Sequence, residues 1–181
     1  GSTVTGGKLS IVGSNSSGVT VNSGGTLGGT GSVAGTVVVL DNRGREDCTV
    51  WGDIMTQYAG ARKIAGTVID GVCRDVNKAL GEGYPLFSKG RFMRTGKDRV
   101  EVVAVNQPVS VGQARVCARD IVVADANGVV IVPRNRAQEV AETARRIEHV
   151  EAQIREQIAT GKSLKEARAA LGYHSLQSKQ P

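Results

Sequence analysis

The spacing of apolar residues divides most of the chain into two regions. From residue 36 to residue 132, short runs rich in valine and isoleucine lie between breaks that contain glycine or proline, which is typical of strands. From residue 137 to residue 158, apolar residues recur every three or four positions, which predicts one long amphipathic helix. We therefore expect an α/β body followed by C-terminal helices. The expected strands are Val37–Leu40, Thr67–Ile69, a strand that begins at Tyr84–Phe87, Val100–Val105, Val109–Val111, Arg115–Cys117, Ile121–Ala124 and Val129–Val132.

Turn and cap residues indicate further boundaries. A helical face made by Ile54, Tyr58 and Ala61 lies between the first two expected strands. The Asn127-Gly128 pair favours a tight hairpin turn. After Gly161, which should end the long helix, Ser163-Leu164-Lys165-Glu166 has the pattern of a capping box and predicts a second, shorter helix.

The first 35 residues are of a different kind. Gly, Ser, Thr, Val and Asn dominate, and Lys8 is the only charged side chain before Asp41. Short alternating runs such as Gly18–Val21 are separated by turn residues, which predicts a β-solenoid-like segment. Because solenoid repeats normally need about three copies to bury their apolar faces, we expect this segment to be unstable by itself.

The amino-acid composition limits the cellular compartment and the kinds of partner that we expect for this chain. No apolar run approaches the ~18 residues that span a membrane, and no cleavable signal pattern opens the chain. The three cysteines, Cys48, Cys73 and Cys117, form no C-x-x-C pair, so neither a disulfide framework nor a thiolate zinc site is indicated, and a cytoplasmic setting is favoured. The net charge of +6 includes a basic stretch at Ser88–Arg99, which we interpret as a solvated or anion-steering face without a nucleic-acid module.

Candidate chemistry gathers in two places. Gly52-Asp53 opens a predicted helix, where free backbone N–H groups and the helix dipole suit an anionic ligand. Arg74-Asp75 follows a β-branched run and offers a planar guanidinium for a carboxylate and a hard oxygen ligand for Mg²⁺ or Mn²⁺. Taken alone, Asp53 could equally be an N-cap and Arg74-Asp75 a surface ion pair.

The spacing of these residues adds a resemblance. Asp53, twenty intervening residues and Arg74-Asp75 resemble the signature of class II pyruvate aldolases that cleave 4-hydroxy-4-methyl-2-oxoglutarate and 4-carboxy-4-hydroxy-2-oxoadipate, a family that also contains RraA-like regulators of ribonuclease E. The resemblance covers about residues 36–172. Further matching blocks, in the family's order, are Asp41–Gly44, Val68–Asp75, Asn106–Val109 and Asp120–Pro133.

The resemblance implies three segments. Residues 36–172 would adopt the family's β/β/α swivelling-domain fold with C-terminal helices, assembled as a homotrimer or hexamer. Residues 1–35 would replace the family's usual N-terminal part. Within them, Ser23–Val33 resembles the β-strand repeat of autotransporter passenger domains. Residues 173–181 would form a disordered tail.

The resemblance also implies a mechanism. Asp75 would bind Mg²⁺ or Mn²⁺, Arg74 would bind substrate oxygen and stabilise enolate charge, and Asp53 would hold a water bound to the ion. The turn at Gly52 and the amides of Ile54 and Met55 would bind the substrate carboxylate. The expected partner is a small 2-oxo acid, without nucleic acid or membrane, and oxaloacetate decarboxylation is the expected side activity of this lyase.

Other functions remain open from the sequence. The main alternative is a non-catalytic RraA-like regulator that binds ribonuclease E, and a second is an inactive hybrid. A Schiff-base lysine is also possible, since Lys63 and Lys78 lie near the candidate residues. Thr160–Ser163 mimics the end of a P-loop but lacks its first glycine and follows a helix, so nucleotide binding through that motif is not expected.

Overall fold

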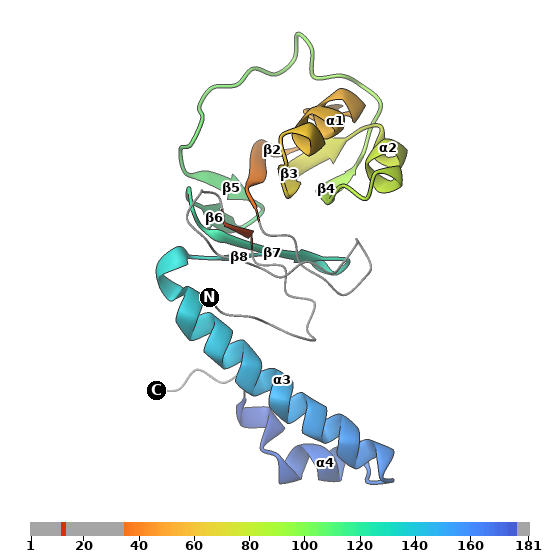
Figure 1. Ribbon diagram of the computed structural model, residues 1–181, viewed down its shortest axis with the longest axis vertical. Helices are drawn as coiled ribbons and strands as arrows, with labels where there is room; N and C mark the ends of the chain where they lie inside the picture. Colours follow the sequence, from red (N-terminus) through yellow and green to blue (C-terminus); the bar gives the residue numbers. More distant parts are fainter. Residues whose placement is uncertain (1–11, 14–34, 177–181) are drawn as a thin grey trace. The chain divides into compact units, whose positions relative to one another are not determined.

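The computed structural model describes residues 12–13 and 35–176, and the chain divides into two compact units, Gly1–Arg134 and Asn135–Pro181 (Figure 1). The first unit contains β1 (Val12–Gly13), β2 (Val37–Thr49), α1 (Asp53–Ala61), β3 (Gly66–Cys73), α2 (Val76–Gly81), β4 (Leu86–Arg91), β5 (Val109–Val111), β6 (Ala114–Val116), β7 (Ile121–Asp125) and β8 (Gly128–Val132). A short 3₁₀ turn, η1 (Arg134–Arg136), leads to α3 (Ala137–Ala159), α4 (Leu164–Ala170) and η2 (Tyr173–Ser175).

The site-bearing part of the first unit is a parallel sheet in the order β2-β3-β4. Helix α1 connects β2 to β3, and α2 connects β3 to β4. Every residue of the central strand β3 is buried, as expected for a parallel strand covered on both faces. Because the strands are parallel, the chain leaves all three at the same edge of the sheet.

Two hydrophobic clusters cover the two faces of this sheet. On one face, Ile69 of β3 packs with Trp51, Ala59 of α1 and Ala79 of α2. On the other face, Val68 packs with Val122 of β7 and with partly buried residues of β7 and β8. The first unit is thus layered as helices, parallel sheet and a second sheet, with α1 and α2 together on one side in Figure 1. The expectation of a mixed α/β fold is confirmed.

The second sheet has the order β1-β7-β8 and is antiparallel. Asp125 pairs with Gly128, so the β7–β8 hairpin turns through Ala126 and Asn127. The predicted tight turn is confirmed, but Gly128 lies at the start of β8 and not within the two-residue turn. The two residues of β1 pair with Val122 and Ile121. The expected solenoid-like segment otherwise lies outside the residues that the structure describes.

The expected strand at Val100–Val105 is wrong. This segment is an irregular connection between β4 and β5, and the side chains of Val102, Val103 and Val105 are 81%, 79% and 70% exposed. A valine-rich sequence forms a strand only where a neighbouring strand satisfies its backbone. Instead, the amides of Arg99 and Val100 both bond to the carbonyl of Gly96, which turns the chain away from the sheet.

The second unit is a helical hairpin. Helix α3 ends at Ala159, and Gly161 follows with a φ of +95°. Ser163 Oγ accepts a bond from the amide of Glu166, while the Ser163 amide donates to the Glu166 carboxylate, so the predicted capping box is confirmed. The Ser163 hydroxyl also donates to the Glu166 carboxylate at 2.6 Å, and this bond is the largest cause that lowers the pKa of the Glu166 carboxyl, followed by the bond from the Ser163 amide. In the described ranges, 12–13 and 35–176, no helix is long and apolar enough to cross a membrane.

Candidate functional site

The candidate residues meet at the edge where the parallel strands end. Trp51 and Gly52 follow β2 and lead into α1, and Arg74 and Asp75 follow β3 and lead into α2. The two connections are joined directly, because the Arg74 amide donates a 3.0 Å hydrogen bond to the Trp51 carbonyl. Residues that are twenty or more positions apart in the sequence are therefore neighbours in the fold.

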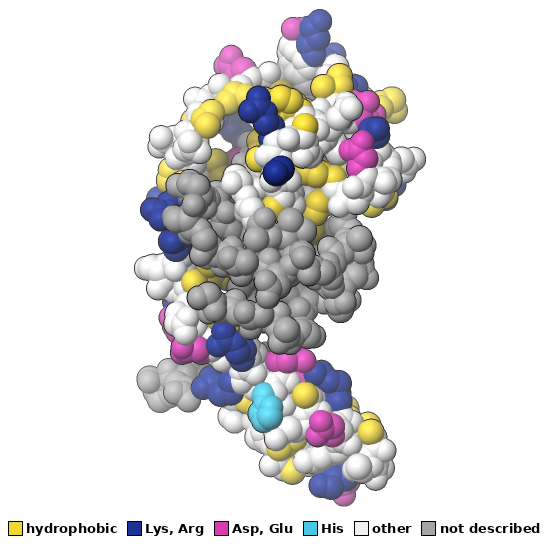
Figure 2. Space-filling model, viewed as in Figure 1, with side chains coloured by type: hydrophobic (Ala, Val, Ile, Leu, Met, Phe, Trp, Pro, Cys, Tyr) yellow, Lys and Arg dark blue, Asp and Glu magenta, His cyan; other side chains and the backbone are white. Residues whose placement is uncertain are grey.

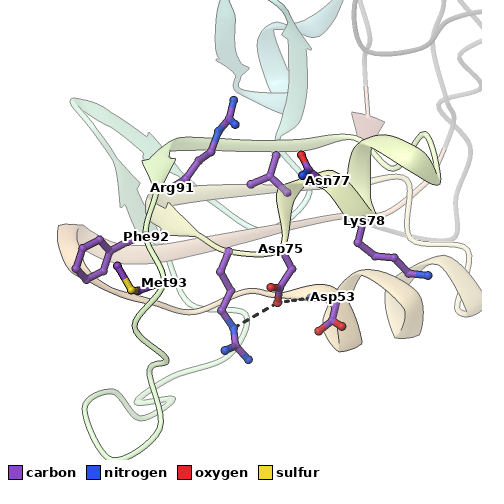
Figure 3. A pocket seen from close by; sticks show the side chains of 9 residues that line it. Asp53, Asp75, Asn77, Lys78, Arg91, Phe92 and Met93 are labelled. Atoms are coloured by element: carbon purple, nitrogen blue, oxygen red, sulfur yellow. Dashed lines mark hydrogen bonds and ion pairs between the residues drawn. The ribbon is translucent and has the colours of Figure 1, made fainter.

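The carboxylate of Asp75 links the two connections. Its Oδ2 accepts a hydrogen bond of 3.2 Å from the backbone N–H of Asp53 and lies 3.4 Å from Nε of Arg74. Figure 3 shows both contacts ending on the same carboxylate, with the Asp53 side chain beside it. Asp75 has a φ of +57°, a left-handed conformation that aspartate tolerates better than most residues. The structure thus brings together Asp53, Arg74 and Asp75.

The first-turn amides of α1 already bind carboxylates. The Asp53 amide donates to Asp75, and the Ile54 amide donates to Oδ1 of Asp53 at 2.8 Å. Both contacts agree with the preference of a helix N-terminus for anions. The expected use of the Ile54 amide by a substrate carboxylate therefore requires the Asp53 side chain to rotate away. The Met55 amide carries no backbone or side-chain bond within residues 35–176.

The close approach of the two connections depends on Gly52. A Cβ at this position would lie 2.8 Å from Asp75 Oδ2, 3.1 Å from Arg74 Nε and 3.4 Å from Arg74 Cγ. Gly52 is itself buried and has an extended backbone. Its role is therefore to leave room for the functional groups of Arg74 and Asp75.

Gly52→Ala is expected to displace the Arg74 and Asp75 side chains. If the site catalyses a reaction, the substitution should lower its kcat/KM by about 10-fold or more, since small misplacements at a reacting centre cost about that much or more. The matched control is Gly60→Ala in the same helix, where an added Cβ meets nothing within 4 Å. That control should keep activity and stabilise α1 by about 0.5–1 kcal/mol. Activity assays and thermal unfolding of both variants check the prediction, and equal activity in the two would contradict it.

These residues open onto a hollow of about 780 Å³. The sequence interpretation missed most of its other lining residues, because α2 and the end of β4 reach the site only through the strand order. Arg91 projects away from the two carboxylates, whereas Lys78 lies on the helix beside them (Figure 3). The lining residues are Asp53, Arg74, Asp75, Val76, Asn77, Lys78, Arg91, Phe92 and Met93.

Lys78 is poorly suited to Schiff-base chemistry. Its ammonium lies 2.9 Å from the carboxylate of Glu82, one helical turn away. The hydrogen bond and charge of Glu82 raise the pKa of Lys78, with the hydrogen bond the larger cause. A Schiff-base lysine needs the neutral amine. Lys63, the other candidate, does not line the hollow.

The donor set at the site fits a hard divalent cation. Within residues 35–176, both contacts of the Asp75 carboxylate use Oδ2, which leaves Oδ1 for a cation, and the Asp53 side chain projects from the adjacent turn (Figure 3). Mg²⁺ is commonly held by one or two carboxylates and takes its other ligands from water and substrate. In the described part of the chain, no group of three or more His, Cys, Asp or Glu side chains gathers around one point.

Comparisons with a family model and with known proteins agree on one family. The model of the RraA-like family, described as Aldolase/RraA, matches residues 30–131. Protein DlpA of Legionella pneumophila is 41% identical over 132 residues, which are 73% of this chain and 22% of DlpA. A putative 4-hydroxy-4-methyl-2-oxoglutarate aldolase of Halalkalibacterium halodurans is 32% identical over 62% of this chain and 53% of its own length.

A solved structure gives the same result for the fold. RraAS2 of Streptomyces coelicolor, described as an unusual member of the RNase ES inhibitor RraA protein family, superposes with a TM-score of 0.62 at 29% identity, over 70% of this chain and 63% of that one. This chain therefore spans about a fifth to two thirds of the length of these three proteins. The family model ends before α3, so the extension of the resemblance to residue 172 stays a prediction.

Proposed function

This chain belongs to the RraA-like (Aldolase/RraA) family, and on that premise we propose that it is a divalent-metal-dependent lyase that releases pyruvate from 4-hydroxy-4-methyl-2-oxoglutarate or 4-carboxy-4-hydroxy-2-oxoadipate. One observation carries the proposal. The backbone of Asp53 and the side chain of Arg74 converge on one oxygen of Asp75 at the rim of a hollow, while the described residues place no hydrogen-bond partner on its other oxygen. The relative named as a putative aldolase supports the same reaction.

Each residue has a defined task in this proposal. Asp75, assisted by Asp53, would hold Mg²⁺ or Mn²⁺, which supplies Lewis acidity to a bound 2-oxo acid. Arg74 donates hydrogen bonds to the keto oxygen and stabilises the negative charge that develops there as the C3–C4 bond breaks. The amides of Ile54 and Met55 bind the carboxylate of the pyruvyl unit, the first of them after the Asp53 side chain has rotated away.

Oxaloacetate decarboxylation follows from the same arrangement. Loss of CO₂ from oxaloacetate leaves the same pyruvate enolate, so Arg74 meets the same developing charge. The reaction requires no further acid or base from the protein at the acceptor half of the substrate. It is therefore the simplest activity to measure first.

We further propose that the chain assembles as a homo-oligomer, a trimer or a hexamer. Several large apolar side chains are exposed close to the site or on the connection after β4, among them Ile54, Tyr58, Met93 and Val102. Figure 2 shows apolar side chains reaching the surface over the part of the chain that contains α1 and α2. Covering such surface with further copies stabilises an assembly. Light scattering is expected to report three copies or more.

The second candidate is a non-catalytic regulator of an RNA-processing enzyme. It is favoured by the likeness to RraAS2, whose description names an RNase ES inhibitor family. A regulator needs an accessible surface and has no requirement for a free carboxylate oxygen next to an arginine. The presence of Asp75 beside Arg74, together with the turn that carries Asp53, therefore favours the lyase.

A panel of 2-oxo acids tests the proposal. Pyruvate release is followed with Mg²⁺ or Mn²⁺ on oxaloacetate, on 4-hydroxy-4-methyl-2-oxoglutarate and on 4-carboxy-4-hydroxy-2-oxoadipate. We expect turnover of oxaloacetate and of at least one hydroxy acid. Absence of pyruvate from all three, in protein that is folded and oligomeric, would contradict the proposed function and favour the regulator.

A further inference from the structure

A buried threonine holds the turn that carries Asp53. The hydroxyl of Thr56 accepts a 3.0 Å hydrogen bond from Trp51 Nε1 and donates one of 3.1 Å to the carbonyl of Gly52. The amide of Thr56 donates to the same carbonyl at 3.0 Å. The Thr56 residue is only 1% exposed, so water does not replace either bond. The Gly52 peptide is therefore held by two bonds from one residue.

The indole of Trp51 is an anchor for this hydroxyl. Trp51 is 4% exposed and stacks on Tyr84 with ring centroids 6.3 Å apart and planes 9° from parallel. The Tyr84 hydroxyl is in turn 2.8 Å from the hydroxyl of Thr67 on β3. Burial raises the pKa of Tyr84, and the bond to Thr67 opposes that rise. The stacked pair thus fixes the indole N–H relative to the parallel sheet.

Trp51 also contacts the other half of the site. Its carbonyl accepts the amide of Arg74, while its indole N–H holds Thr56 and, through it, Gly52. One residue therefore fixes the spacing between the turn at Gly52 and the Arg74-Asp75 connection. At that spacing the Asp53 amide is within hydrogen-bond distance of Asp75, and no room is left for a Cβ on Gly52.

We propose that Thr56 is a positioning residue of the site, and that its hydroxyl, bonded between Trp51 and Gly52, sets the place of the first-turn amides of α1 relative to Arg74 and Asp75. Gly52 has no side chain that packing could hold, so its carbonyl is the group through which its position is fixed. A role in packing alone would need only the shape of Thr56. A positioning role needs the hydroxyl, because only a group that both donates and accepts can connect an N–H to a carbonyl.

The experiment separates these two roles with three variants. Thr56→Val keeps the shape and removes the hydroxyl, Thr56→Ala removes hydroxyl and methyl together, and Thr56→Ser keeps the hydroxyl. Activity is measured on oxaloacetate with Mg²⁺, which makes this readout dependent on the proposed function. We expect Val and Ala to raise KM and to lower kcat/KM by about 10-fold to 10²-fold, and Ser to stay within about threefold of the wild type. A loss of folded protein alone would lower apparent kcat and leave KM unchanged.

A second readout does not depend on any activity. The amides of Asp53 and Arg74 donate to protein oxygens, so their hydrogen exchange reports whether the two connections keep their spacing. We expect faster exchange of the Asp53 amide in Thr56→Val and Thr56→Ala, and wild-type exchange in Thr56→Ser. Trp51 is the only tryptophan of the chain, so its emission should shift in the two variants that leave its N–H without a partner.

The outcomes are distinguishable. If the wild type releases no pyruvate while the exchange and emission changes occur as expected, the proposed function fails and the positioning role stands. If Thr56→Val and Thr56→Ala keep wild-type exchange and KM, or if Thr56→Ser is as impaired as Thr56→Ala, the positioning role is overturned. Should Thr56→Val fail to fold, the comparison of Ala with Ser still decides, because those two side chains differ only by the hydroxyl.

Discussion

Asp75→Asn is expected to abolish metal-dependent pyruvate release, with a fall in kcat/KM of about 10³-fold or more. The amide keeps the size of the side chain and can still accept the bond from the Asp53 backbone, but it loses the charge that a hard cation requires. Asparagine also tolerates the left-handed backbone at this position. The fold should therefore survive while cation binding is lost.

The measurement for Asp75→Asn is pyruvate release together with calorimetric titration of Mn²⁺. The matched control is Asp47→Asn, an exposed carboxylate that pairs with Arg45 and does not line the hollow. That control should bind Mn²⁺ and turn over oxaloacetate as the wild type does. An Asp75→Asn protein with wild-type turnover would exclude Asp75 as the metal ligand.

Arg74→Lys is expected to lower kcat by about 10²-fold or more while the protein stays folded and still binds Mn²⁺. Lysine keeps the positive charge but offers a single ammonium in place of the planar guanidinium, so the fixed fork of N–H donors to a developing enolate oxygen is lost. A loss of this size is comparable to the removal of one oxyanion-hole donor. The ion pair with Asp75 is long at 3.4 Å and partly exposed, so its loss costs little stability.

The effect of Arg74→Lys is measured as a split between kcat and KM on oxaloacetate. Arg62→Lys, an exposed arginine that lies over the ring of Tyr58 at the end of α1, is the control and should keep both constants. If Arg74→Lys changes KM alone, the arginine binds the ground state only and does not stabilise the enolate.

The elements predicted from the sequence are those with local signals. Valine- and isoleucine-rich runs located β3, β7 and β8, and the Ser163 and Glu166 pair located the start of α4. Val100–Val105 has the same composition as those strands but lies in an exposed connection, because strand formation depends on a partner that the sequence does not reveal.

The candidate site, too, could be predicted from the sequence only in part. Asp53, Arg74 and Asp75 were identified from their spacing, and the structure brings them into contact. The bond of the Ile54 amide to the Asp53 carboxylate and the bridging hydroxyl of Thr56 lie within residues 51–56, but they depend on side-chain rotamers that the sequence does not reveal. Arg91 and Met93 reach the hollow because β4 lies beside β3 in the sheet, an arrangement that their position in the sequence does not indicate.

The alternative of a regulator makes opposite predictions for these variants. A binding surface would tolerate Asp75→Asn and Arg74→Lys, since neither substitution changes the exposed apolar side chains such as Tyr58 and Met93. Binding to an RNA-processing enzyme that persists in both variants, in a protein without lyase activity, would support that alternative.

The central claim is that pyruvate release by this chain depends on a divalent cation at Asp75. Its most direct test treats the wild-type protein and Asp75→Asn with a chelator, removes the chelator, and measures oxaloacetate decarboxylation by each before and after addition of Mg²⁺ or Mn²⁺. The metal-catalysed background is measured in a sample without protein and subtracted from both. We predict that activity is lost on chelation, returns in the wild type on addition of either ion, and does not return in Asp75→Asn. Activity that survives chelation, or equal recovery in Asp75→Asn and the wild type, would contradict the account.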